Sequence, residues 1–434
     1  MENKIKVVWI THFSNKEIRS HIKFDRLYYK RTLKKILLRK DYIIGDFAVW
    51  NTSAIRQFEK FDDIDLTIVF PHRGIRPKVQ RFDINGIHYI AFRSEDDYLC
   101  QVLKKKLFKR ISSHFKKNRN IIASFIADVQ PDIVHIIGAE IPYYSIAALD
   151  IPNEIPSVVT LQTLMSDPNF FTNYPISKGE YEFRSDLEKQ IIRKCCFIGS
   201  SIEYFKSITW RLIKKDAVFL NLSLAVGVDV DESPSEKEYD FVYFAANISK
   251  ACDFAIEAFA LANKHHPGIT LNVSGSYQSE YKAKLELRLE ELGIQGQVFF
   301  TGPKVTHEDV IKQIKKSRYA LLPLKVDLIS GTIREAMACG LPVVTTITPA
   351  TPSLNKDRES VLLSEKGDFQ AMADNMIRLV ENESYASQIR INAIKTIKER
   401  YSNECFMQKW RKAYHEIVEN SKNGTPFSEE IVTR

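Results

Sequence analysis

The stretch DLISGTIREAMACGLPVV, residues 327–344, decides the fold class of this chain. An apolar segment precedes it at 319–324, and its own end continues into a second apolar segment at 342–346; both segments predict β-strands. The residues between them therefore predict the helical crossover of a strand–helix–strand unit. In such units, ligands bind at the carboxyl ends of the strands.

The start of the predicted helix suits an anion. Ser330 is a favourable N-cap residue, and Gly331 lets a ligand approach the backbone closely. The unpaired backbone amides of Gly331, Thr332 and Ile333 present partial positive charge at this end of the helix. The sequence thus predicts a site for a phosphate or diphosphate group here.

Two acidic residues, Asp327 and Glu335, bracket this anion site, with seven residues between them. Together with the run AMACGLPVV at 336–344, they resemble the signature of retaining glycosyltransferases with the GT-B fold, family 4 (group 1). That family more often has glutamate at the first position, so Asp327 is a shorter substitute. The resemblance implies that Glu335 binds the ribose hydroxyls of the donor and that Asp327 lies near the transferred sugar. The alternative, a capped helix before an ordinary strand, explains neither acid nor the Gly-x-Pro-Val-Val segment.

The length of 434 residues predicts two domains, because a single hydrophobic core stops growing below this size. Strands alternate with helices along most of the chain, which predicts an α/β protein with parallel sheets. The resemblance implies two Rossmann-like domains facing a central cleft. We expect an acceptor-binding domain at 1–228 and a donor-binding domain at 229–403. A helix at 404–420 would cross back to the first domain, and a polar, mobile tail would follow at 421–434.

The expected elements follow from the apolar patterns. Strands are predicted at 6–10, 66–70, 88–92, 133–137, 158–161, 196–198, 241–245, 269–274 and 298–301, and helices at 254–265, 281–292 and 404–418. Thr306 and Asp309 predict a capping box at the start of another helix. Phe406, Trp410 and Tyr414 form an aromatic stripe that predicts packing on a core. The polar stretch 229–240 is predicted to link the domains.

A second donor-binding element is expected after the strand at 241–245. The resembled family commonly has Gly-Arg followed by lysine there, and the two cations bind the diphosphate. Lys250 occupies the lysine position and Asn247 the arginine position, which removes a bidentate phosphate contact. Either Asn247 donates a neutral hydrogen bond or another cation compensates; Arg334 is a candidate, unless it is a solvated surface arginine. Gly302 and Pro303 resemble the base-binding loop, although a plain turn also explains them.

The first domain is expected to bind the acceptor. His12 follows the first strand, where the family often has a glycine-rich loop, and it is a candidate contact to the acceptor or the sugar. Gln162 stands where the family frequently has a histidine; glutamine can hydrogen-bond a sugar hydroxyl but cannot relay protons. Glu140 is a third candidate contact, whereas His135 is predicted to be buried.

The formal net charge of +8 is unevenly distributed. Lysines and arginines gather near 23–40 and 104–119, interleaved with apolar residues, which suits an anionic membrane surface holding a lipid-linked acceptor. Two helices that bury their apolar stripes against the sheet are the alternative. No nucleic-acid-binding module is recognisable, so nucleic acid is not an expected partner. The six cysteines lack metal-ligand spacing, and no metal or cofactor is expected beyond a nucleotide-sugar co-substrate.

The combined expectation is a cytoplasmic enzyme of the hexosyltransferase type (EC 2.4), peripheral on the inner face of the plasma membrane. It would move a sugar, with retention, from a nucleoside diphosphate sugar to a hydroxyl of a glycan or lipid-linked acceptor in bacterial surface polysaccharide or glycoconjugate synthesis. UDP is favoured because it is the commonest nucleotide in the resembled family. Lys250, Asp327 and Glu335 are the expected catalytic residues. A catalytically inactive paralogue, a sugar-nucleotide epimerase and a membrane adaptor are the alternatives.

Overall fold

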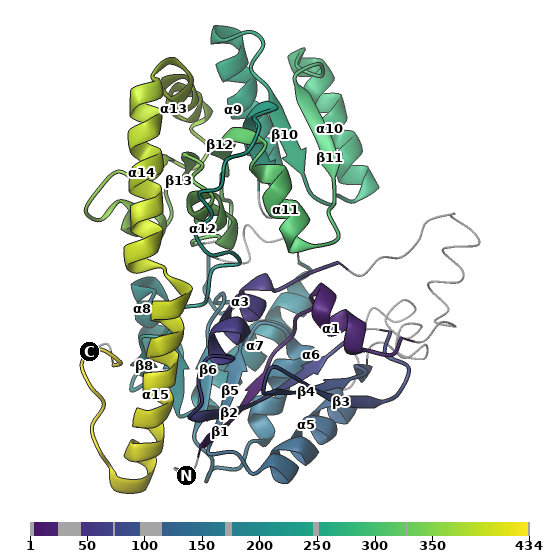
Figure 1. Ribbon diagram of the computed structural model, residues 1–434, viewed down its shortest axis with the longest axis vertical. Helices are drawn as coiled ribbons and strands as arrows, with labels where there is room; N and C mark the ends of the chain where they lie inside the picture. The colour runs from purple at the N-terminus through teal and green to yellow at the C-terminus, as the bar shows by residue number, and fades with distance from the viewer. Residues whose placement is uncertain are drawn as a thin grey trace. The chain divides into compact units, whose positions relative to one another are not determined.

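The computed structural model describes residues 4–24, 45–72, 74–95, 115–169, 176–245, 251–326 and 328–432. The chain divides into two compact units (Figure 1). Unit 1 comprises Met1–Phe171, Ile176–Ala225 and Asn403–Arg434, and unit 2 comprises Thr172–Pro175 and Val226–Ser402. Each unit contains its own largely parallel sheet, so the predicted α/β fold class is confirmed.

Unit 1 contains an eight-stranded sheet with the order β3-β4-β2-β1-β5-β6-β7-β8. The strands are β1 (Ile5–Ile10), β2 (Ile64–Pro71), β3 (Val79–Ile84), β4 (Ile87–Phe92), β5 (Ile133–Ile137), β6 (Ser157–Thr160), β7 (Phe197–Gly199) and β8 (Val218–Leu220). Neighbouring strands are parallel except β3 and β4. Because β1 lies between β2 and β5, the strand order reverses there, and the carboxyl ends of β1 and β5 mark a topological switch point.

The helices of unit 1 flank this sheet. They are α1 (Lys16–His21), α3 (Val49–Phe58), α5 (Lys116–Val129), α6 (Pro142–Ser145), η3 (Ile146–Asp150), α7 (Lys178–Lys194), α8 (Glu203–Leu212) and α15 (Asn403–Asn423). The aromatic stripe of α15 is buried as predicted: Trp410 and Tyr414 are at most 1% exposed. Tyr414 Oη accepts a hydrogen bond of 2.7 Å from Trp9 Nε1 and lies 2.6 Å from His135 Nδ1. His135 is fully buried, as predicted, and burial lowers its pKa to about 3.

The end of the stretch predicted as a mobile tail contacts unit 1 at Ile431 and Val432, and its predicted mobility stays a prediction. Ile431 is fully buried, and its carbonyl accepts a 2.7 Å hydrogen bond from the amide of Asn221. Val432 pairs with Leu220 in an isolated bridge at the edge strand β8.

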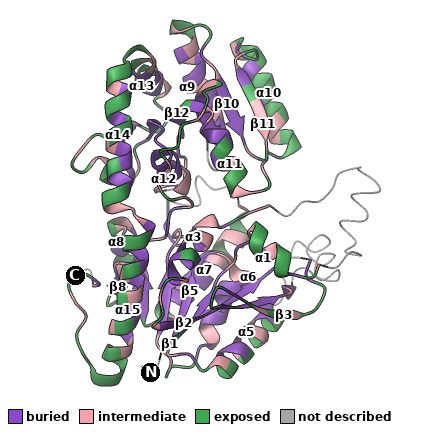
Figure 2. Cartoon of the chain, in the orientation of Figure 1, coloured by how far each residue is buried: buried purple, intermediate pink, exposed green. Residues whose placement is uncertain are grey.

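Unit 2 contains a six-stranded parallel sheet with the order β11-β10-β9-β12-β13-β14. The strands are β9 (Tyr239–Phe244), β10 (Leu271–Ser274), β11 (Val298–Gly302), β12 (Ser317–Leu321), β13 (Val343–Thr346) and β14 (Leu362–Ser364). The helices are α9 (Cys252–His265), α10 (Ser279–Leu292), α11 (His307–Ile314), α12 (Gly331–Ala338), η6 (Thr351–Asn355), α13 (Phe369–Glu381) and α14 (Glu383–Arg400). The strands are mostly buried, and the helices expose their outer faces (Figure 2). Here the switch point lies between β9 and β12.

The stretch predicted as a linker packs on unit 2 instead of running free. The amide of Asp231 donates to the carbonyl of Ala338 at 2.9 Å, and its carboxylate pairs with Lys315 at 2.6 Å. The amide of Glu238 donates to the carbonyl of Lys316 at 2.7 Å, directly before β9. These contacts fix the start of the second sheet.

Among the described helices, none has the length and apolar character that a membrane crossing requires. The basic segments predicted near 23–40 and 104–119 lie mostly outside the described residues, so their predicted membrane contact stays a prediction.

Candidate functional site

The helix start predicted to hold an anion is present in unit 2. α12 begins at Gly331, directly after Ser330, which occupies the N-cap position. Ser330 does not cap the helix with its side chain; its Oγ instead lies 2.8 Å from Thr332 Oγ1. The N-cap side chain therefore accepts no hydrogen bond from the first backbone amides of α12, including that of Ile333. This helix start lies on the carboxyl edge of the sheet, beside the switch point.

Glu335 lies one helical turn further along α12, and its side chain is only 9% exposed. Its Oε1 lies 3.3 Å from Nε2 of His307, the first residue of α11. The sequence pointed to Glu335 but not to His307, because a single histidine at a helix start carries no distinguishing pattern. The predicted capping box beside it is confirmed: Thr306 Oγ1 accepts from the amide of Asp309 at 3.1 Å.

The structure describes some of the other residues predicted for the donor site and not the rest. Gly302 ends β11 with φ +71°, a conformation that favours glycine, and Pro303 follows it. Arg334 is half-buried, and burial lowers the pKa of its guanidinium, so it is not a solvated surface arginine. Its guanidinium carbon lies 5.9 Å from the ring centre of Tyr401. Asn247, Lys250 and Asp327 lie outside the described residues, and their roles stay predictions.

Two lysines that sequence reasoning missed follow strands at the same edge of the sheet. Lys325 comes after β12, pairs with Asp253, and lies 4.4 Å from the ring centre of Phe254. Lys366 comes after β14 and donates to the carbonyl of Lys325 at 2.6 Å. Burial and the neighbouring Lys325 lower the pKa of Lys366. Lys366 adds positive charge to the edge where the diphosphate is expected, whereas the charge of Lys325 is balanced by Asp253.

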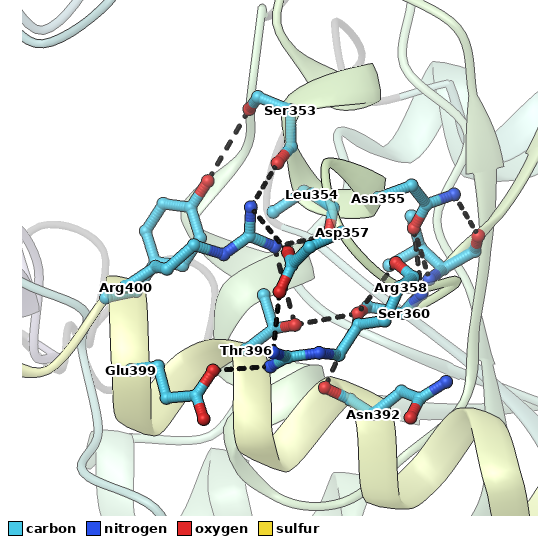
Figure 3. Close-up of polar contacts among 12 residues, drawn as sticks. Ser353, Leu354, Asn355, Asp357, Arg358, Ser360, Asn392, Thr396, Glu399 and Arg400 are labelled. Carbon is cyan, nitrogen blue, oxygen red and sulfur yellow. Dashed lines mark hydrogen bonds and ion pairs between the residues drawn. The ribbon is translucent and has the colours of Figure 1, made fainter.

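A polar network supports the loop that leads into α12. Thr348 Oγ1, after β13, donates to the carbonyl of Leu328 in that loop. The following η6 segment is held by Arg400 of α14, which donates to the carbonyls of Ser353 at 2.9 Å and Leu354 at 2.7 Å (Figure 3). Arg358 adds a 2.7 Å ion pair to Glu399 in the same network. The loop before α12 is thus tied to the last helix of unit 2.

In unit 1, the structure brings the predicted contact residues together at the carboxyl end of β5. Gly138 has φ +93°, and a Cβ there would lie 2.6 to 2.9 Å from Tyr144 Oη, Gln162 Nε2 and Glu140 Oε2. Gln162 donates from Nε2 to the carbonyl of Ile137 at 3.0 Å. Only glycine at position 138 allows these three side chains to gather around one backbone point.

Glu140 is a buried carboxyl group in this cluster. Burial raises its pKa to about 7, and its Oε2 has no hydrogen-bond partner among the described residues. Glu188 of α7, which sequence reasoning missed, is fully buried, and burial raises its pKa to about 7 as well. It accepts hydrogen bonds from the amides of Met165 at 2.9 Å and Ser166 at 2.7 Å. Glu188 therefore fixes the segment that carries Gln162 after β6.

His12, at the end of β1, lies in an aromatic environment. Its ring stacks on Phe47 and Tyr144, with ring centres 5.6 and 5.1 Å apart. Burial lowers the pKa of His12 to about 4, so the imidazole is neutral at pH 7. A neutral ring among aromatic faces suits contact with a sugar ring better than transfer of a proton at neutral pH.

No group of three or more His, Cys, Asp or Glu side chains arranged to hold a metal ion occurs within the described parts of the chain.

A family model described as "Glycosyl transferases group 1" matches residues 229–396. The chain is 25% identical over 136 residues to N-acetyl-alpha-D-glucosaminyl L-malate synthase of Bacillus anthracis, covering 31% of this chain and 35% of that protein. It is 26% identical over 166 residues to poly(ribitol-phosphate) alpha-N-acetylglucosaminyltransferase of Staphylococcus aureus, covering 37% and 32%. The match thus spans about a third of the length of each of these relatives.

Solved structures match over nearly the whole chain. Sucrose-phosphate synthase from Thermosynechococcus elongatus has a TM-score of 0.69 at 13% identity, covering 95% of this chain and 99% of that one. Anabaena HepE, solved in complex with UDP, has a TM-score of 0.62 at 13% identity, covering 95% and 100%. At these identities the likeness shows a shared fold.

Proposed function

We propose that this protein is a glycosyltransferase, because residues 229–396 match the glycosyl transferases group 1 model and the chain shares the fold of the solved structures described above. It moves a sugar from a nucleoside diphosphate sugar to a hydroxyl of a glycan or lipid-linked acceptor, in bacterial surface polysaccharide or glycoconjugate synthesis. The names of the matched relatives, which include sugar transfer to a poly(ribitol-phosphate), support this class of acceptor.

The observation that carries this proposal is the pairing of an uncapped helix start with a buried carboxylate one turn further on. The amides of Gly331, Thr332 and Ile333 stabilise the charge that develops on the departing diphosphate. Glu335 accepts hydrogen bonds from the ribose hydroxyls of the donor. Lys250 adds a cation to the diphosphate site in this proposal.

Retention at the anomeric carbon is proposed from the resemblance of the Asp327 to Val344 segment to retaining enzymes. Asp327 orients the transferred sugar, and no metal ion or further cofactor takes part. UDP is the proposed nucleotide, supported by the complexes of the structurally similar HepE with UDP and with UDP-glucose. Gly302 and Pro303 are proposed to lie near the base.

The carboxyl edge of the sheet in unit 1 is proposed to bind the acceptor or the transferred sugar. Glu140, with a buried oxygen not used in any described hydrogen bond, accepts from or donates to a sugar hydroxyl. Gln162 and His12 line the same edge, where amide and aromatic groups recognise hydroxyls and ring faces. The basic segments near 23–40 and 104–119 are proposed to bring the protein to an anionic membrane surface on its cytoplasmic side.

The test is thermal unfolding with UDP, GDP, ADP and their sugars. A nucleotide at a hundredfold excess over its dissociation constant stabilises the folded chain by about 2.7 kcal/mol. We expect one nucleotide class to raise the unfolding midpoint of the wild type but not of Glu335→Ala. The matched control is Glu381→Ala, which changes a half-exposed glutamate elsewhere in unit 2 and must keep the shift.

No shift with any nucleotide would contradict the proposal and favour an inactive paralogue that serves as a binding subunit. That alternative draws on Gln162, whose amide already donates to the carbonyl of Ile137, and on Asn247 at the position of the family's arginine.

A further inference from the structure

His307 and Glu335 meet at the carboxyl edge of the sheet in unit 2, although they come from different helices. His307 begins α11, which follows β11, and Glu335 lies in α12, which follows β12. Nε2 of the imidazole lies 3.3 Å from Oε1 of the carboxylate, and the two side chains are only 18% and 9% exposed. The contact lies within ion-pair distance but not in hydrogen-bond geometry, so the imidazole attracts the carboxylate through its charge when protonated, and the low exposure limits screening by salt.

Rigid neighbours fix the position of each partner. The Thr306 side chain caps α11, accepting from the amide of Asp309 at 3.1 Å and donating to its carboxylate at 2.6 Å, which sets where His307 lies. Ile333, Ala336 and Met337, which surround Glu335 in the sequence, are fully buried and anchor α12 on the core. Because both helices are held in place by other contacts, the contact between His307 and Glu335 mainly restricts the side-chain rotamer of Glu335.

A carboxylate has two oxygens, and this contact occupies only one of them. With Oε1 facing the imidazole, Oε2 remains to accept hydrogen bonds from a ligand. A glutamate that is already held in one orientation loses less conformational entropy when the ligand binds, which increases affinity.

We infer that His307 is a positioning residue of the nucleotide site: its imidazole holds the Glu335 carboxylate so that the free oxygen faces the ribose hydroxyls of the donor. This inference rests on the proposed function, because Glu335 contacts a ribose only if unit 2 binds a nucleotide. His307 acts through Glu335 and does not itself need to contact the donor.

A double-mutant cycle tests this role, with the dissociation constant of UDP measured by titration calorimetry, and with GDP and ADP titrated alongside. The proteins are the wild type, His307→Leu, Glu335→Gln and the double variant. We expect His307→Leu to weaken binding about fivefold to tenfold, the size of one partly buried ion contact. In the Glu335→Gln background, the same change should weaken binding much less, because the carboxylate that it orients is gone.

Two further variants separate positioning from a structural role. His307→Gln should restore part of the affinity, because the glutamine amide reaches about as far from the backbone as Nε2 and can donate to Oε1. His266→Leu is the matched control: His266 forms another histidine–glutamate pair in unit 2, 2.8 Å from Glu381, and its loss should leave UDP affinity unchanged.

The outcomes distinguish this inference from the proposed function. If the wild type binds none of the three nucleotides, both the proposed function and the positioning role of His307 are contradicted. If the wild type binds a nucleotide and the two losses are additive, or His307→Leu binds as the wild type does, only the positioning role is overturned. A lower unfolding midpoint of the ligand-free His307→Leu protein, together with additive losses, would assign His307 a structural role.

Discussion

Glu140 has a carboxyl group whose ionisation opposes folding of unit 1. Burial raises its pKa from the ordinary value of 4.5 to about 7, and the pKa of the nearby Glu188 is raised to about 7 as well. The folded state therefore favours the protonated carboxyl, and this favourable contribution is lost as the pH rises through 7.

We predict that Glu140→Gln stabilises the protein at pH 8.5 by about 1 to 3 kcal/mol, because the amide is never charged. At pH 4 the variant and the wild type should unfold at similar temperatures, since the wild-type carboxyl is then mostly protonated in the folded and the unfolded state. Thermal unfolding across this pH range is the measurement. Glu180→Gln, in a more exposed part of α7, is the control and should show no such pH dependence. A variant that is less stable than the wild type at pH 8.5 would refute the buried-charge argument.

Gly138 is a second residue whose chemistry is set by its surroundings. Alanine there would be strained at φ +93° and would place a Cβ 2.6 Å from Tyr144 Oη and 2.7 Å from Gln162 Nε2. We predict that Gly138→Ala lowers stability by about 2 kcal/mol and weakens acceptor binding, because Gln162 must move. Urea unfolding gives the first quantity. Gly179→Ala, in α7 with open space around it, should instead leave stability nearly unchanged.

At the level of elements, Arg400 connects α14 to the η6 segment after β13. Its guanidinium donates to the carbonyls of Ser353 and Leu354, and its side chain is 23% exposed. Removing the donors leaves these carbonyls without their charged partner. We predict that Arg400→Met lowers the free energy of unfolding by about 1 to 3 kcal/mol, measured by urea denaturation. Arg288→Met, which removes exposed ion pairs on α10, should have a much smaller effect.

The sequence predicted most elements that have long apolar patterns, within a few residues of the observed bounds, but it missed three strands. β8 and β14 have three residues each, too few for a pattern. β3 is an edge strand of mixed burial that pairs with β4 in a hairpin. The turn between them is Asn85-Gly86, with φ of 49° and 80°, and this residue pair is a typical hairpin signal.

The sequence predicted those parts of the candidate site that lie within one contiguous segment. The helix start at Gly331 and the burial of Glu335 belong to one strand–helix–strand unit, so a single segment predicts both. His307 and Glu188 could not be found in this way. Each contacts a partner that lies in another part of the sequence. Glu188 also lies in a helix so rich in charged residues that its sequence predicts a solvated side chain.

At the level of the whole molecule, the core of unit 1 depends on a helix from the far end of the chain. Trp410 is 1% exposed, its ring centre lies 5.4 Å from that of Trp9, and its Nε1 donates to the carbonyl of Ser223 at 3.0 Å. We predict that Trp410→Ala lowers the stability of unit 1 by about 3 to 5 kcal/mol. The matched control on α15 is the exposed Gln408→Ala, which should be close to neutral.

Differential scanning calorimetry with limited proteolysis would locate this loss. Cleavage should increase within residues 1–225 and not within 226–402, because the missing side chain belongs to unit 1. Equal destabilisation of both units would contradict their assignment as separate compact bodies.

The return of α15 to unit 1 also sets the order in which a ribosome can complete this protein. After residue 225 emerges, the whole of unit 2 must be translated before Trp410 and Tyr414 become available. At typical elongation rates this takes roughly 10 to 40 s, during which the nascent chain exposes the surface around Trp9 and His135 that α15 later covers. A circular permutant that is translated from residue 403 onward would supply α15 first and should depend less on chaperones during synthesis.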